Sequence, residues 1–262
     1  MITGRSSAPI SPEVWGALEA DVREALRQHL VGRRVVDFDG PHGIERAALN
    51  LGSLEPRDAE DGIEAGLRAV LPLLEVRVPF HLSRSALDAR ERGAPQLSDE
   101  PALAAARRLA DLENRAIFHG LASAGIRGLL AASTQPRIPI GNDARSTIDA
   151  VARALLALHD AAIDGPYAVV LGDEAYRRLA AGGEYPPLKQ LRELVGGEVH
   201  HSHVVQGGIV VSLRGGDLTL CVGQDPAIGY AKHDADQVSL YLLESFTFLV
   251  SSPEVIVGLE GP

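Results

Sequence analysis

The chain has 262 residues, of which 45% are hydrophobic and 23% charged, and its formal net charge is −10. This length and apolar share suffice for a large globular core. The acidic balance, with no long basic run to offset it, opposes binding to nucleic-acid phosphates. No window approaches about 18 uninterrupted apolar residues, and the first residues lack an apolar segment. The sequence therefore predicts neither a membrane span nor a secretory signal.

The single cysteine, Cys221, excludes a disulfide within the chain. That usage fits a reducing cytoplasm, where we expect the protein to reside. Cys221 stands in a predicted strand, so we expect it to be a small core residue. Lys189 and Lys232 are the only lysines, and arginine carries the remaining positive charge. Arginine suits ion pairs at interfaces, which favours an extensively associated protein, although a G+C-rich genome would produce the same bias.

The first predicted helix begins at Ser11-Pro12, a capping serine followed by proline at the first helical position. Apolar residues recur at helical spacing from Val14 to Leu30, and Gly32 should end the helix. The following Gly40-Pro-His-Gly43 is typical of a turn, with His42 as a turn residue rather than a ligand.

Residues 47–77 differ from the rest of the chain, because their middle is acidic and turn-rich. Pro72 and Pro79 exclude a central position in a sheet for the extended segment around them. A long two-stranded excursion is poorly stable alone, so we expect it to lean on a neighbouring subunit. The alternative is an ordinary exposed hairpin.

The remaining elements follow from apolar periodicity and from Gly and Pro punctuation. A long helix should run from Ser98 to about His119, with Gly120 after it, and on it Asp111 and Glu113 should be solvated or ion-paired. Further helices are expected over residues 147–162, 173–179 and 189–195, and strands over 167–171, 208–213, 218–222 and 238–250.

One histidine cluster, at His200, His201 and His203, could carry chemistry. On a strand His201 and His203 share a face, and two imidazoles can bind a transition metal. No metal, nucleotide or nucleophile motif accompanies them. Polar residues of an exposed strand explain the cluster more simply, so we predict no catalytic residues, no resident metal and no cofactor.

Several segments in their order resemble encapsulins, the linocin-like bacterial shell proteins. They include APISPEVW, GRRVVDFDGPHG, LPLLEVRVPFHLSR, NRAIFHGLASAGIRGL, RGGDLTLCVGQDPAIGY and LYLLESFTF. The resemblance implies an α+β fold of the tailed-phage major capsid protein type (Hong Kong 97-type), built from a peripheral domain, an axial domain and an extended loop. The helix at the N-terminus favours an encapsulin over a viral capsid protein.

The resemblance also implies a division of the chain. Residues 1–47 would hold the N-terminal helix and the start of the peripheral domain, 48–79 the extended loop, and 80–134 the peripheral domain with its spine helix. Residues 135–224 would form the axial domain, and 225–262 would return to the peripheral domain. Gly183, Glu184 and Tyr185 would lie in a pore loop, where Glu184 would favour cations.

The function implied by the resemblance is a self-assembling icosahedral shell, most simply of the smallest T=1 class. Such a shell encloses a cargo enzyme, a dye-decolourising peroxidase or a ferritin-like iron-storage protein, through a short targeting peptide. The positions matching the peptide-binding groove are Leu30, Arg33, Val36, Asp37, Asp225 and Ile228. A short extended peptide gains from apolar pockets, and a charged pair fixes its direction.

Four departures from the family pattern are visible. Pro226 replaces a leucine at the groove rim, His200-His-Ser-His203 replaces a stretch that is usually apolar or contains proline, and Ser85 stands where some members carry a flavin-stacking tryptophan. No flavin site is therefore expected. Residues 48–79 contain no lysine, so the lysine–asparagine cross-link of one phage capsid cannot form within them. Two alternatives to a cargo shell remain: a prophage-derived capsid protein that packages DNA, and a metal-dependent enzyme built on His201 and His203.

Overall fold

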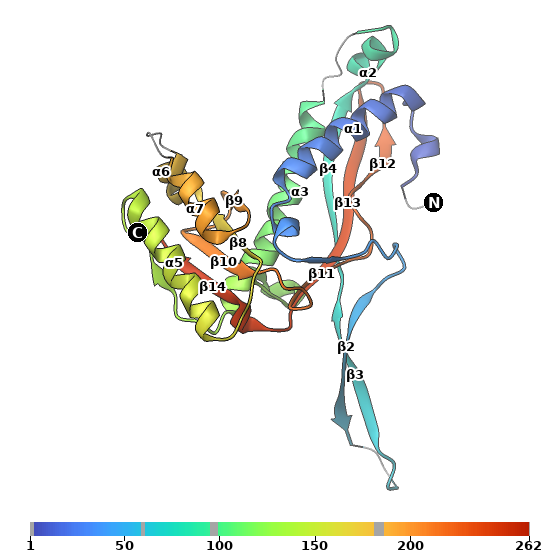
Figure 1. Ribbon diagram of the computed structural model, residues 1–262. Coiled ribbons are helices and arrows are strands. Elements are labelled where there is room, and N and C mark those ends of the chain that lie inside the picture. Colours follow the sequence, from blue (N-terminus) through green and yellow to red (C-terminus); the bar gives the residue numbers. More distant parts are fainter. Residues whose placement is uncertain (1–2, 59–60, 95–98, 181–185, 262) are drawn as a thin grey trace.

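A computed structural model describes residues 3–58, 61–94, 99–180 and 186–261. Two sheets with their helices form two bodies, and a long hairpin projects from the first body (Figure 1). The helices are α1 (Pro12–His29), α2 (Arg84–Glu91), α3 (Glu100–Phe118), α4 (Leu129–Ala132), α5 (Ala144–Asp160), α6 (Asp173–Ala180) and α7 (Pro187–Val195).

The first sheet is organised around β13 (Gln237–Val250), whose alternating apolar residues predicted a long strand. Along one edge β13 pairs with β4 (Leu74–Ser83). Along the other it pairs successively with β12 (Ala227–His233) and β11 (Leu218–Val222), and β1 (Asp37–Asp39) extends the sheet beside β11. Pro79 lies in β4, and among the described residues β4 pairs only with β13. β4 is therefore an edge strand, which confirms the prediction that the segment around Pro79 takes no central position in a sheet.

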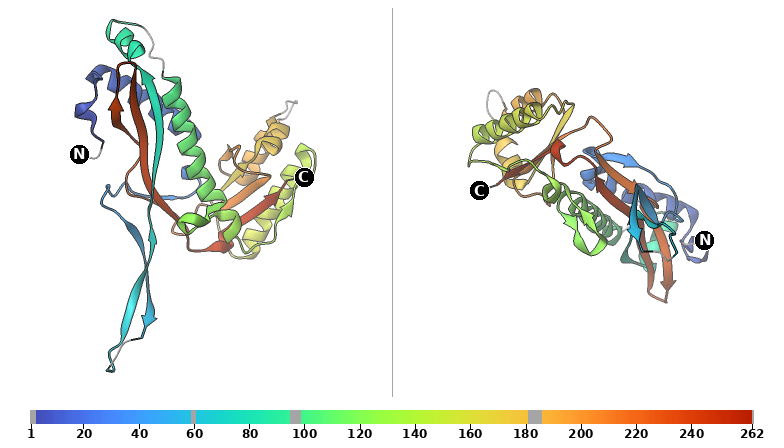
Figure 2. Two further views of the ribbon diagram at one scale, coloured as in Figure 1. Left: turned by 180° about the vertical axis from the view of Figure 1, so that it is seen from behind. Right: turned by 90° about the horizontal axis from the view of Figure 1, so that it is seen from below.

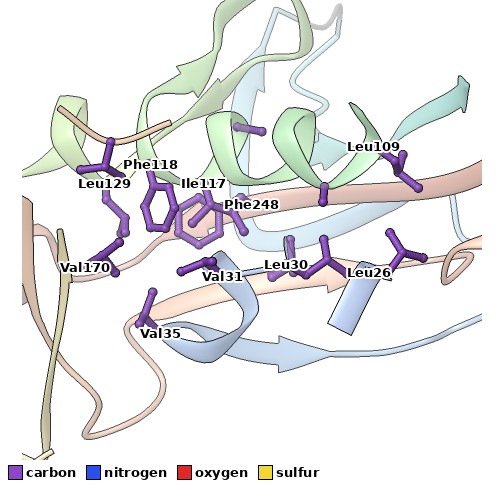
Figure 3. Packing of buried hydrophobic residues seen from close by; sticks show 14 of the residues in the cluster. Leu26, Leu30, Val31, Val35, Leu109, Ile117, Phe118, Leu129, Val170 and Phe248 are labelled. Carbon is purple, nitrogen blue, oxygen red and sulfur yellow. The ribbon is translucent and has the colours of Figure 1, made fainter. Parts of the chain in front are cut away.

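Two helices cover this sheet, α3 directly against β4 and β13 and α1 against α3 (Figures 1 and 2). Ser11 caps α1 as predicted, its Oγ accepting from the Val14 amide at 3.5 Å. In the core Leu30 and Val31 face Ile117 and Phe248 (Figure 3). The cluster continues through Phe118, Leu129 and Val170 into the second body, so one apolar core joins the two bodies.

The second sheet has the order β7-β14-β10-β8-β9. Its strands are β7 (Ile138–Pro139), β14 (Ile256–Glu260), β10 (Gly208–Ser212), β8 (Tyr167–Leu171) and β9 (Val199–His201). Helices α5 and α7 pack on it. β14 joins this sheet although it follows β13 of the first, and β11 joins the first sheet although β10 lies in the second. The division at residues 224 and 225 that the family resemblance implied did not include these crossings. The side-chain pattern of a strand does not identify its partner strand.

The projecting hairpin consists of β2 (Ala48–Arg57) and β3 (Ala65–Pro72), as the sequence predicted for this segment (Figure 2). Leu54, Ile63 and Leu67 are 64%, 67% and 57% exposed there. The hairpin thus presents large apolar side chains that its own chain does not cover. Two short strands, β5 (Gly120–Leu121) and β6 (Ile126–Arg127), form a separate small hairpin after α3.

Helix ends differ slightly from the sequence predictions. α5 begins before Thr147 because Asp143 accepts from the Ser146 amide at 2.7 Å and caps the helix. α1 ends at His29, and a short 3₁₀ helix over Gly32–Arg34 follows. The Gly32 amide donates to Asn114 Oδ1 at 2.8 Å, and a Cβ on Gly32 would lie 2.5 Å from the Ile117 side chain. This close approach to α3 directs the next residue, Arg33, towards the sheet.

Candidate functional site

A groove of about 450 Å³ lies between α1 and the start of β12. Its residues come from one face of the helix, from the 3₁₀ turn and from the Asp225–Ile228 segment: Glu19, Val22, Arg23, Leu26, Arg27, Leu30, Arg33, Arg34, Asp225, Pro226, Ala227 and Ile228. Val22, Leu26, Leu30 and Ile228 are buried, each less than a tenth exposed. The groove therefore has an apolar floor and a charged rim, which suits a short peptide with apolar side chains.

Arg33 is the centre of an ion-pair cluster at one end of the groove. Its Nε and Nη2 donate to the carboxylate of Glu113 on α3, the shortest contact being 2.7 Å. Nη2 also donates to Glu244 of β13, and Nη1 donates to Asp225 Oδ1 at 2.7 Å. Glu113 and Glu244 are fully buried, whereas the Asp225 side chain is 48% exposed. Asp225 is thus the carboxylate of the cluster that a molecule in the groove can reach.

The charges of this cluster are unequal, with three carboxyl groups around one guanidinium. Burial by itself lowers the pKa of Arg33, but the hydrogen bonds and charge of Glu113, with the charge of Glu244, raise it well above its usual value. Burial, followed by the nearby charge of Glu113, raises the pKa of Glu244 well above its usual range. Arg33 therefore stays charged, and the neutral form of Glu244 is favoured.

The structure brings together four of the six positions assigned to the groove: Leu30, Arg33, Asp225 and Ile228 all line it. Val36 and Asp37 instead line a smaller cavity of about 130 Å³ beside the turn before β11. There Asp37 Oδ2 accepts from the Gly216 amide at 2.8 Å.

Gly183, Glu184 and Tyr185, assigned to a pore loop, lie outside the described residues. The flanking helices α6 and α7 end at Ala180 and begin at Pro187. The role of these three residues stays a prediction.

Sequence reasoning missed Glu244 and the burial of Glu113. Glu113 is ion-paired, as one of the two predicted possibilities, but it is fully buried rather than solvated. Glu244 is the only charged residue in β13, and this isolated charge is the signal that could have marked it. Its partner could not be named, because Arg33 lies 211 positions away.

The three histidines do not form one site. His201 Nε2 lies 2.6 Å from Asp173 Oδ1, and His203 Nε2 lies 3.0 Å from Asp111 Oδ1. β9 ends at His201, so His203 does not continue the face that the sequence assigned to both. His201 and His203 thus each contact a carboxylate, and the metal-site alternative that pairs them loses the shared strand face it assumed. Asp111 is ion-paired, as predicted.

Comparison with known proteins decides the family. A family model described as "Encapsulating protein for peroxidase" matches residues 1–247. A Type 1 encapsulin shell protein of Mycobacterium tuberculosis is 39% identical over 258 residues, covering 97% of each chain. The chain belongs to the encapsulin shell proteins. The Rhodospirillum rubrum encapsulin is 41% identical over 268 residues, covering 98% of this chain and 95% of its relative.

Solved structures confirm the capsid-type fold of this encapsulin. A virus-like particle protein from Pyrococcus furiosus superposes with a TM-score of 0.68 over 95% of this chain and 100% of its own, at 18% identity. The capsid protein of Myoviridae phage XM1 superposes with a TM-score of 0.58, covering 86% of this chain and 90% of its own, at 12% identity. The predicted α+β fold of the Hong Kong 97 type is therefore confirmed. No helix among the described residues is both long and apolar enough to span a bilayer.

Proposed function

We propose that copies of this chain assemble into a closed icosahedral shell of the smallest T=1 class, which encloses a cargo enzyme in the bacterial cytoplasm. Membership of the encapsulin family and the capsid-type fold support assembly. The uncovered apolar side chains Leu54, Ile63 and Leu67 on the β2–β3 hairpin support contact with a neighbouring subunit.

The observation that carries cargo binding is the groove between α1 and β12. An extended targeting peptide would place apolar side chains over Leu26, Leu30 and Ile228, and Arg33 with Asp225 would set its direction. Many equivalent grooves on one shell would turn weak single contacts into firm retention of an oligomeric cargo.

The cargo is a dye-decolourising peroxidase or a ferritin-like iron-storage protein. The description of the matching family model favours the peroxidase. The chemistry, whether defence against oxidants or storage of iron, would then belong to the cargo, and the shell chain would have no catalytic role. We further propose that residues 135–224 contribute the axial domain and that Gly183, Glu184 and Tyr185 border a pore.

Assembly is tested by size-exclusion chromatography of the purified chain followed by negative-stain electron microscopy. Uniform hollow particles are expected. A monomer or dimer under mild conditions would overturn the shell, and nucleic acid copurifying inside particles would favour the DNA-packaging alternative.

Cargo binding is tested by co-expression with a dye-decolourising peroxidase or a ferritin-like protein, each with and without its C-terminal targeting peptide. Cargo should copurify with particles only when the peptide is present. Ile228→Asp, which places a charge in the apolar floor, should abolish loading, whereas Lys232→Ala on the same strand outside the groove should not. Equal loading by both variants would remove the groove from the proposal.

A further inference from the structure

Three potential metal ligands of different chemistry converge where β1 meets β11. Asp39 and Cys221 are directly opposite one another in this parallel strand pair. His42 returns to them from the following turn, and its Nε2 lies 2.8 Å from Asp39 Oδ1. One potential ligand atom from each of the three residues lies within 4.8 Å of those of the other two. Among the residues that the structure describes, these three are the only group of three or more His, Cys, Asp or Glu side chains whose potential ligand atoms all lie within 4.8 Å of one another.

The backbone holds this arrangement in place. The His42 amide donates to the Val222 carbonyl at 3.0 Å, and the Gly43 amide donates to the Gly223 carbonyl at 2.8 Å. Gly40 has φ +152°, and a Cβ there would lie 2.5 Å from the Val222 carbonyl oxygen. Only glycine permits this tight return of the chain, which brings His42 back over the strand carrying Cys221.

We propose that Asp39, His42 and Cys221 form a binding site for a zinc-like divalent cation. Thiolate, imidazole and carboxylate are the three ligand types that Zn²⁺ takes in proteins. Around a tetrahedral ion with bonds of about 2.0–2.3 Å, the ligand atoms lie roughly 3.3–3.8 Å apart. The 2.8 Å contact between Asp39 and His42 therefore opens when the ion binds, and the Cys221 sulfur, now within 4.8 Å of both, moves to the ion. The thiolate distinguishes this site from an oxygen site for Mg²⁺ or Ca²⁺.

Exposure and charge fit an open site with three protein ligands. Cys221 is fully buried, whereas the side chains of His42 and Asp39 are 37% and 43% exposed. An ion can therefore enter from the surface and keep a water molecule in its fourth position. The thiolate and the carboxylate together balance the double positive charge, and the imidazole binds through its unprotonated nitrogen. The thiol proton leaves to solvent when the ion binds.

One neighbouring cation, Arg46, lies close to the Cys221 thiol. Burial raises the pKa of the Cys221 thiol, as does the charge of Asp39, while Arg46 beside it lowers the pKa. Arg46 repels a bound cation but can donate to the thiolate, and its buried Nε has no hydrogen-bond partner.

The test uses Co²⁺ and Zn²⁺ with the purified, assembled protein. Because Cys221 is the only cysteine, a thiolate-to-cobalt charge-transfer band can arise only at this site. One Zn²⁺ per chain is expected by calorimetry, together with that band in the Co²⁺ form. His42→Ala, a change at a partly exposed position, should weaken binding at least tenfold, and Cys221→Ser should abolish the band. His159→Ala, at an 80% exposed histidine, is the matched control and should change neither.

Absence of the cobalt band, or Zn²⁺ binding that His42→Ala leaves unchanged, would overturn the proposal. A second readout guards against misfolding of the buried Cys221 variant: Zn²⁺ should raise the thermal midpoint of the wild-type protein and not that of His42→Ala. Electron microscopy of each sample separates a lost metal site from a lost shell, so this proposal and the shell can fail independently.

Discussion

The Nη2 of Arg33 and the Oε2 of Glu113 lie 2.7 Å apart, although the two residues are 80 positions apart in the chain. This contact joins the turn after α1 to the C-terminal half of α3. Because Glu244 of β13 shares the same guanidinium, one arginine links the helix layer to the sheet at the end of the groove.

Replacing Arg33 with methionine should destabilise the protein strongly. The substitution leaves the fully buried Glu113 without a counter-charge, and breaking such a pair costs about 3–5 kcal/mol. The measurement is the chemical or thermal unfolding midpoint. Arg27→Met, in a solvent-exposed pair with Glu24, is the control and should change little. Equal midpoints for the two variants would show that the cluster contributes no stability.

Replacing Glu244 with glutamine should flatten the pH dependence of stability. The pKa of Glu244 is raised in the folded state, so the folded protein binds more protons and loses stability as pH rises above the usual value of 4.5. Glutamine cannot ionise, so the stability of the variant relative to wild type should increase as the pH rises from 4.5 towards neutrality. Thermal midpoints measured across that range check this. Glu75→Gln, in an exposed pair on β4, should leave the wild-type profile unchanged.

Charging the hairpin should block assembly without unfolding the subunit. Ile63→Asp and Leu67→Asp place carboxylates where we propose a neighbouring subunit packs, and each buried side chain of this kind contributes about 1.5–3 kcal/mol. Size-exclusion chromatography should show small oligomers with unchanged circular dichroism. Ser53→Asp, an exposed change on the same hairpin, controls for added charge. Intact particles from both apolar variants would contradict contact through the hairpin.

Replacing Asp37 with alanine should lower stability modestly and leave cargo loading unchanged. Its carboxylate accepts a hydrogen bond from the Gly216 amide, and such a bond contributes about 1 kcal/mol to stability. Cargo loading should not change, because Asp37 lines a different cavity from the groove. Asp37→Asn keeps an acceptor oxygen and should restore most of the lost midpoint. Reduced loading at an unchanged thermal midpoint would return Asp37 to the peptide site that the family resemblance suggested.

Much of the secondary structure could be predicted, because its causes are local. The apolar run of β8 matches its observed bounds Tyr167–Leu171, and the alternation of β13 differs by one residue at its start. The hairpin was recognised from its proline and charge content. Of the groove, resemblance supplied Leu30, Arg33, Asp225 and Ile228, but it also grouped Val36 and Asp37 with them, which face another cavity.

Most helices and strands, and the family, could be predicted from the sequence, because capping, periodicity and motif order depend on neighbouring residues. The folded structure was needed to show that β14, which follows β13 in the chain, belongs to the second sheet, and that Glu113 and Glu244 contact Arg33. It also placed His42 and Cys221, expected to be a turn residue and a core residue, beside Asp39. The physical reason is the same in each case: these contacts join distant segments, and the packing of the whole chain, rather than any local pattern, selects which of them form.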